Sequence, residues 1–376
     1  MKTFSYVPRE GWSQRLPVEL DSPQTLVLAF CAPGYHDERG PLDELLAAFP
    51  HSHVLGCSSA GEIFGAELRD ESLSCGIVRF ADTRLRRAYA RVEGSAGSFA
   101  AGAAVAGQLA APDLRGVFVL SDGHTVNGTA LIQGMGSTLP EKLIVTGGLA
   151  ADGNRFERTW VIHDRDLRQG EVSAVGFYGD RIRIGHGSQG GWDIFGPERL
   201  ITRSDGNVLF ELDGRPALEL YKEYLGELAA GLPATALLFP LAVRSPGDER
   251  QTVRTVLNVD ERDSSMVFAG DVPAGAMAQL MKANFDRLVQ GAAHAALATR
   301  ANTPEDVDVL AVAISCFGRR LVLNERTEEE LEVTVETLPR RSHLVGFYSY
   351  GEISPYGGGR CELHNQTMTL TTFAEP

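Results

Sequence analysis

The chain has 376 residues, of which 43% are hydrophobic and 22% charged, and its 35 basic and 49 acidic residues give a net charge of −14. This length suits two domains, and the acidic excess lacks the basic footprint that nucleic acid or an anionic membrane requires. No apolar stretch approaches the ~20 residues of a membrane-spanning helix, so we expect a protein that binds neither nucleic acid nor membrane.

We expect the protein to be cytoplasmic. Residues 1–12 carry charges and a proline in place of the apolar core of a signal peptide. The five cysteines form no C-x-x-C pair, which argues against a zinc ribbon, and scattered single thiols fit a reducing compartment.

A unit of strand, helix and strand that ends in a glycine-rich corner recurs about three times along the chain. The three units have predicted first strands at 25–31, 116–120 and 309–314, helices at 42–49, 128–136 and 327–337, and second strands at 51–57, 142–146 and 343–348. Alternating strands and helices predict an α/β (α+β) fold of mixed sheets flanked by helices, in two related domains. The corners lie at the carboxyl ends of strands, where such sheets bind ligands.

A strand-rich segment lies between the second and third units. Asp205-Gly206-Asn207 predicts a hairpin turn, and Pro216 precedes a predicted helix over 217–225. A longer helix is predicted over 274–300. We place the domain division in this region, with one domain at 1–215 and the other at 216–376.

The phrase G-x-x-S-x-G-E-I occurs twice, at 56–63 and at 346–353. Its glutamates, Glu62 and Glu352, are candidates for a paired site that binds a ligand amino group or acts as acid and base. The alternative is structural, because a glutamate after glycine can accept backbone N–H bonds and stabilise the corner. Neither phrase is G-x-S-x-G and no base accompanies its serines, so a hydrolase is not favoured.

Ligand-binding residues are predicted from all three corners. A tyrosine hydroxyl there could bind a ligand carboxylate, and the backbone N–H groups of 147–153 could approach an anion. That segment lacks the order of a nucleotide-binding loop. The predicted set is Ser59, Gly61, Glu62, Gly148, Asp152, Tyr348, Tyr350, Gly351 and Glu352.

One histidine is a candidate for a haem ligand, since haem needs a single axial imidazole and no spacing motif. His186 follows a strand in a glycine-rich segment and precedes Trp192 and Phe195, whose rings could line an apolar cavity. His124, in a strand-end loop, is the second candidate. An ordinary structural histidine is the alternative for both.

Five stretches resemble the FIST proteins, which carry paired FIST N and FIST C domains. These stretches are 56–63, 121–131, 145–161, 206–226 and 346–373. The resemblance implies a sensory module for small ligands, with amino acids proposed, and one branch of the family consists of haem proteins that sense nitric oxide and act on a histidine kinase.

From this resemblance we expect a non-enzymatic sensor that signals through a partner such as a histidine kinase. Its ligand would be nitric oxide on haem, or an amino acid or other polar metabolite at the corners. An enzyme that uses Glu62 or Glu352 as acid and base remains an alternative. The sequence allows a homo-oligomer without selecting one.

Overall fold

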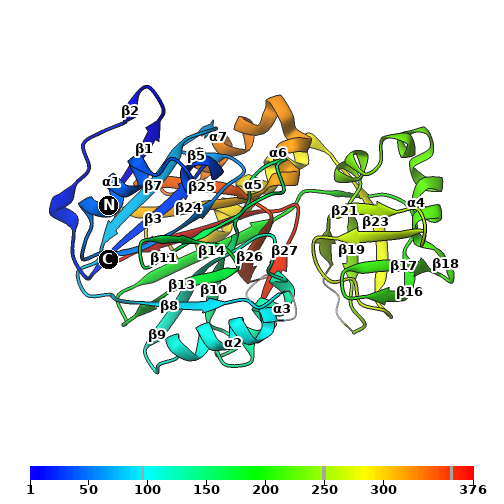
Figure 1. The fold of residues 1–376 in the computed structure, drawn as a ribbon, viewed down its shortest axis with the longest axis horizontal. Helices are drawn as coiled ribbons and strands as arrows, with labels where there is room; N and C mark the ends of the chain where they lie inside the picture. The colour runs from blue at the N-terminus through cyan, green and yellow to red at the C-terminus, as the bar shows by residue number, and fades with distance from the viewer. Residues whose placement is uncertain (95–96, 248–250, 356–358) are drawn as a thin grey trace.

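The computed structural model describes residues 1–94, 97–247, 251–355 and 359–376. Residues 356–358 of the last family-like stretch therefore lie outside the described residues. Figure 1 shows a large body that contains both termini and a smaller lobe at one side. The lobe is inserted between strand β14 (Arg183–Gln189) and helix α5 (Phe285–Thr299). Among the described residues, no helix is long and apolar enough to span a membrane.

The body consists of three copies of one unit, which confirms the predicted recurrence. Each copy runs through a leading strand, a central strand, a helix, a second strand parallel to the central one, a hairpin and a return strand. The first copy contains β1 (Lys2–Val7), β3 (Thr25–Cys31), α1 (Gly40–Ala48), β4 (His53–Ser58), β5 (Glu62–Phe64), β6 (Glu67–Arg69) and β7 (Leu73–Arg79). Short elements β2 (Gly11–Trp12), η1 (Val18–Leu20) and η2 (Pro33–His36) accompany it.

The second and third copies repeat this order with additional helices. The second contains β8 (Arg84–Arg91), α2 (Ser98–Leu109), β9 (Leu114–Ser121), α3 (Gly128–Gly136), β10 (Ile144–Leu149), β11 (Val161–His163), β12 (Asp166–Arg168) and β13 (Glu171–Tyr178). The third contains β14, α5, β24 (Val309–Cys316), α6 (Phe317–Leu323), η6 (Asn324–Arg326), α7 (Thr327–Thr337), β25 (Ser342–Ser349), β26 (Gly351–Pro355), β27 (Cys361–His364) and β28 (Met368–Ala374).

The hairpin of each copy leaves its own sheet and extends the sheet of another copy. Strand β5 pairs with β25, β11 pairs with β4, and β26 pairs with β10. The exchange is cyclic, so each sheet of the body contains strands from two copies. Two of these sheets contain strands from both sides of residue 215. The domain division between residues 215 and 216 stays a prediction.

The three sheets enclose one apolar core, and the helices cover their outer faces. Rings from different sheets meet inside, with Phe30 stacked on Phe347 and Phe177 stacked on Phe373, each pair at 4.7 Å between centroids. Helix α1 packs on the sheet of β3, α2 and α3 on that of β9, and α5 on that of β24. Burial of this apolar surface supplies the main driving force for closing the three sheets.

The lobe has a separate apolar core. It contains β15 (Asp193–Ile194), β16 (Arg199–Asp205), β17 (Val208–Leu212), β18 (Arg215–Pro216), α4 (Ala217–Leu225), η4 (Gly226–Gly231), η5 (Ala234–Leu238), β19 (Leu241–Arg244), β20 (Thr252–Arg254), β21 (Val256–Asp260), β22 (Ser265–Phe268) and β23 (Met277–Lys282). Asp205 pairs with Val208, so the predicted hairpin turn is confirmed.

The helix predicted over 274–300 is wrong in its first part. Residues 277–282 form β23, which pairs with β16 and β19, and α5 begins only at Phe285. The Asn284 side chain caps that helix by accepting the N–H of Arg287 at 3.3 Å. A short apolar run fits a strand and a helix equally well, so pairing inside the lobe decided the outcome.

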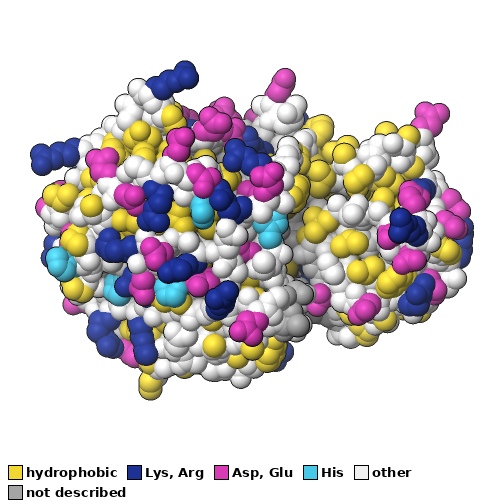
Figure 2. All heavy atoms as spheres, in the orientation of Figure 1, with side chains coloured by type: hydrophobic (Ala, Val, Ile, Leu, Met, Phe, Trp, Pro, Cys, Tyr) yellow, Lys and Arg dark blue, Asp and Glu magenta, His cyan; other side chains and the backbone are white. Residues whose placement is uncertain are grey.

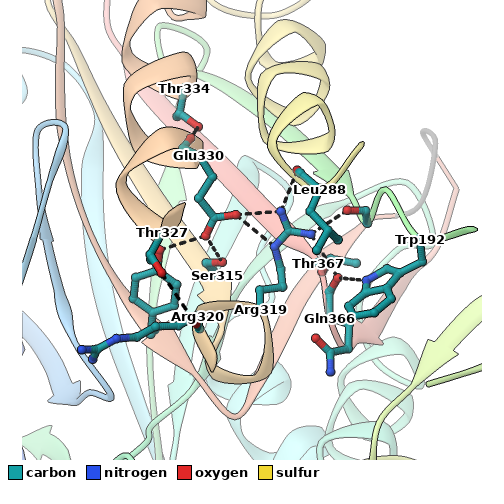
Figure 3. Close-up of polar contacts among 12 residues, drawn as sticks. Trp192, Leu288, Ser315, Arg319, Arg320, Thr327, Glu330, Thr334, Gln366 and Thr367 are labelled. Carbon is teal, nitrogen blue, oxygen red and sulfur yellow. Dashed lines mark hydrogen bonds and ion pairs between the residues drawn. The ribbon is translucent and has the colours of Figure 1, made fainter. Parts of the chain in front are cut away.

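A buried ion pair anchors the lobe to the body where the chain leaves β14 and returns to α5 (Figure 3). Arg319 and Glu330 have fully buried side chains that meet at 2.7 Å. Arg319 also donates to the carbonyl oxygens of Gly190 at 2.6 Å and Leu288 at 2.8 Å, which flank the lobe in the sequence. Ser315 donates to the other carboxylate oxygen of Glu330 at 2.9 Å.

We expect Glu330→Gln to lower the free energy of unfolding by about 3–5 kcal/mol, because it leaves the Arg319 charge buried without a carboxylate. The double variant Arg319→Met, Glu330→Leu should recover much of this loss. The exposed pair Arg341–Asp308 provides the control, and Asp308→Asn should cost less than about 1 kcal/mol in denaturant unfolding. Equal small losses in all variants would show that the pair does not anchor the lobe.

Candidate functional site

The three glycine-rich corners meet at one end of the body. The N–H of Ala60 donates to the carbonyl of Tyr348, and the N–H of Tyr348 donates to the carbonyl of Gly61, both at 2.9 Å. The second corner joins through Ala151, whose N–H donates to the carbonyl of Ser58 at 3.0 Å. The predicted residues, although distant in sequence, therefore come from segments in direct contact.

Glu62 is held inside the first corner and is 1% exposed. One carboxylate oxygen accepts the Ser59 hydroxyl, and the other accepts the N–H and hydroxyl of Ser72 at 3.0 and 2.8 Å. Both oxygens are thus satisfied by residues of the same copy, which favours the structural role for Glu62.

Glu352 repeats this arrangement in the third corner, where it is fully buried. It accepts the Ser349 hydroxyl at 2.7 Å and the N–H and hydroxyl of Thr367 at 3.2 and 2.9 Å. Among the described residues, no hydrogen bond joins Glu352 to Glu62. The assignment of the two glutamates to one ligand site stays a prediction, and their burial favours the structural alternative.

Burial raises the pKa of both carboxyl groups from 4.5 to about 8, although their serine and threonine partners act in the opposite direction. Between these two values the folded corner keeps its proton, whereas the unfolded chain has already lost it. The resulting stability is fully present below the lower value and is lost as the pH rises through the upper one.

Glu62→Gln cannot titrate, so the stability advantage of the wild type over this variant should shrink with pH. We expect a decrease on the order of 3 kcal/mol between about pH 5 and about pH 8, and the same for Glu352→Gln. Urea unfolding at several pH values measures it, with the exposed Glu332→Gln as control. A difference that stays constant with pH would contradict the raised pKa values.

The predicted glycines lie where side chains would collide. Gly61 has φ +130°, and a Cβ there would lie 2.5 Å from the Arg320 guanidinium. Cβ atoms at Gly148 and Gly351 would each lie 2.9 Å from a core methyl group. Close packing of the corners accounts for these three glycines.

Asp152 and Tyr350 meet in the remaining corner, as parts of a half-exposed aromatic cluster. The Asp152 carboxylate accepts the Tyr350 hydroxyl at 2.5 Å and His124 Nε2 at 3.2 Å. Burial would raise the pKa of Asp152, but these bonds and two backbone N–H groups hold it well below its usual range. The hydrogen bond that His124 makes to the Asp152 carboxylate raises the pKa of His124. Phe156, which is 59% exposed, stacks on Tyr350.

Tyr348 and His186 lie apart from this cluster. Tyr348 is fully buried and donates its hydroxyl to Glu330 at 2.8 Å, so it supports the lobe anchor. His186 is half-buried on β14, opposite Thr371, and burial lowers its pKa. Within the described ranges, no group of three or more His, Cys, Asp or Glu side chains could hold a metal ion.

A cavity of about 580 Å³ lies between the lobe and the body, and the sequence did not reveal it. The body lines it with α3, the loop after α3 and β27, and the lobe lines it with parts of β19 and β20 and with Asp271 and Pro273. Figure 2 shows the crease where body and lobe meet. This volume falls in the range of small-molecule sites. His186 is not among the lining residues.

Arg254 brings a buried positive charge to this cavity. It lies at the end of β20 and is 8% exposed. Its guanidinium donates to the carbonyl oxygens of Asp271 at 2.9 Å, Val253 at 3.2 Å and Leu363 at 3.3 Å. In the sequence Arg254 is one charge within the strand-rich segment, and only the tertiary structure buries it.

Comparison with protein families decides the relationship. The FIST N domain matches residues 25–215, and the FIST C domain matches residues 217–355. The chain belongs to the FIST family. FIST domains are sensory domains of signal transduction. The boundary between the two matches falls inside the lobe, within β18 and directly before α4.

Relatives from two genera are uncharacterized proteins. One from Mycobacterium tuberculosis is 28% identical over 271 residues, which cover 68% of this chain and 67% of that protein. One from Methanocaldococcus jannaschii is 24% identical over 268 residues, covering 62% of this chain and 49% of that protein. Among solved structures, a cyanuric acid hydrolase from A. caulinodans aligns over 93% of this chain and 89% of its own, with 10% identity and a TM-score of 0.34, too low to support an inference.

Proposed function

We propose that this FIST protein senses a small polar metabolite that binds in the cavity between lobe and body, and that it passes occupancy to a partner protein. The observation that carries the proposal is that both parts line this cavity. A ligand there contacts lobe and body together, so it stabilises one packing of the two over others. Such differential affinity is the physical requirement for a ligand-driven change.

Hydrogen bonds between described residues join the lobe and the body beside the cavity. Arg254 of the lobe donates to the Leu363 carbonyl of the body at 3.3 Å, and Asn127 of the body donates to Asp271 of the lobe at 3.2 Å. On the far side, the Arg319–Glu330 pair fixes the chain segments that enter and leave the lobe. In this proposal the anchored side acts as the pivot and the cavity side responds to the ligand.

The partner and the absence of catalysis are parts of the same proposal. A histidine kinase is the partner class that the family resemblance suggests. The non-enzymatic role is supported by Glu62 and Glu352, whose carboxylate oxygens are all engaged within their corners. Both side chains are also buried, so a substrate does not reach them in this packing.

Haem-based sensing of nitric oxide is the second candidate, with His186 as the axial ligand. Burial lowers the pKa of His186, which favours the neutral imidazole that binds iron. Against it, the cavity between lobe and body does not include His186. An absorption spectrum after expression with haem precursor tests this version, which requires a Soret band that shifts with nitric oxide and is lost in His186→Ala.

A thermal-shift screen of amino acids and related metabolites tests the cavity version. A ligand at about 100 times its Kd should add about 2.7 kcal/mol to the free energy of unfolding and raise the Tm. Hydrogen exchange should then slow on both sides of the cavity, in β20 and in α3. Ligands that raise the Tm without protecting either segment would place the site elsewhere and overturn the proposal.

A further inference from the structure

The chemistry of the proposed ligand can be narrowed from the surroundings of Arg254. All three hydrogen-bond acceptors of its guanidinium are neutral main-chain carbonyls, and Nη2 donates to no residue that the structure describes. A buried cation held only by carbonyl groups has lost water without gaining a bonded counter-charge. Since Arg254 lines the cavity, a ligand there can supply that charge.

Two carboxylates lie near Arg254, but the hydrogen bonds of its guanidinium go to main-chain carbonyls. The Asp271 carboxylate accepts the Asn127 amide at 3.2 Å, while Arg254 contacts only the Asp271 main chain. Burial lowers the pKa of Arg254 to about 10, although the charges of Asp271 and Glu362 act in the opposite direction. Among the described residues, no carboxylate accepts a hydrogen bond from the Arg254 guanidinium.

Part of the cavity wall is apolar, although the charged side chains of Glu141, Arg360 and Glu362 also line the cavity. Ile132 and Met135 of α3, Leu139 and Leu143 of the following loop, and Val145 at the start of β10 line the side that the body contributes. Arg254 lies on the lobe side. A molecule with one acidic end and an apolar body would match both sides at once.

We propose that the cavity binds a small organic anion whose acidic group pairs with Nη2 of Arg254 and whose apolar body packs against the α3 side. The inference rests on the proposed function, because it assumes that this cavity is the sensory site. Guanidinium groups present parallel N–H donors that suit carboxylate, phosphate and sulfonate oxygens.

Two fluorescent probes that differ by one acidic group test the inference on the full chain. The probe 8-anilinonaphthalene-1-sulfonate carries an aromatic body and a sulfonate, and N-phenyl-1-naphthylamine has the same ring system without the sulfonate. We expect saturable binding of the sulfonate probe. In Arg254→Met its Kd should rise at least about tenfold, the effect of losing one charge-assisted hydrogen bond, while the Kd of the neutral probe changes less than about twofold.

Arg244→Met is the matched control. Arg244 lies on the neighbouring strand β19, pairs with Glu198 and does not line the cavity, so its loss should leave both Kd values unaltered. If Arg254→Met does not fold, Leu143→Glu replaces it, because a carboxylate in the apolar wall should repel the sulfonate probe selectively.

The inference is overturned if the sulfonate probe does not saturate, if Arg254→Met weakens both probes equally or neither, or if Arg244→Met has the same effect. These results leave the sensory proposal standing as long as a metabolite from the screen still protects β20 and α3. A different result is possible, in which no metabolite protects β20 and α3 but the sulfonate probe still binds and depends on Arg254. That result would contradict the sensory role and support the anion site.

Discussion

The cyclic exchange of hairpins is the constraint on which the body depends. Because β5 and β6 complete the sheet of the third copy, β11 and β12 that of the first, and β26 and β27 that of the second, each sheet is completed from another copy. The exchange sets the three sheets around one core and carries the corner before each hairpin across to a neighbouring copy. Edge strands that would otherwise expose unpaired backbone groups are extended in the same way.

The exchange also explains why the corners carry buried carboxylates. A chain that crosses from one sheet to the next must turn sharply, and its backbone and hydroxyl groups then need partners away from water. Glu62 and Glu352 supply acceptors at two crossings, each through the same pattern of serine, glutamate and a hydroxyl residue before the return strand. At the remaining crossing Asp152 bonds outward to His124 and Tyr350, so the symmetry is broken there.

The repeated units of this fold could be predicted from the sequence, but the pairing of strands between different units could not. Apolar runs such as 25–31 and 309–314 identify central strands, and glycine-rich corners identify where they end. Nothing local to Glu62 indicates that its strand pairs with Phe347, 285 positions away (347 − 62). For the same reason the apolar residues of β23 predict the start of a helix, and nothing local identifies Arg254 as buried.

The cavity arises where the lobe departs from the threefold pattern. In the first and second copies the leading strand is followed within the body by the central strand, whereas in the third copy the lobe intervenes between β14 and α5. The hairpin of that same third copy lies on the sheet of the second copy, where β27 faces α3. Lobe, hairpin and α3 thus converge from two copies on one space. A ligand there would contact both the inserted lobe and the interlocked body, so its affinity would depend on how the two are packed against each other.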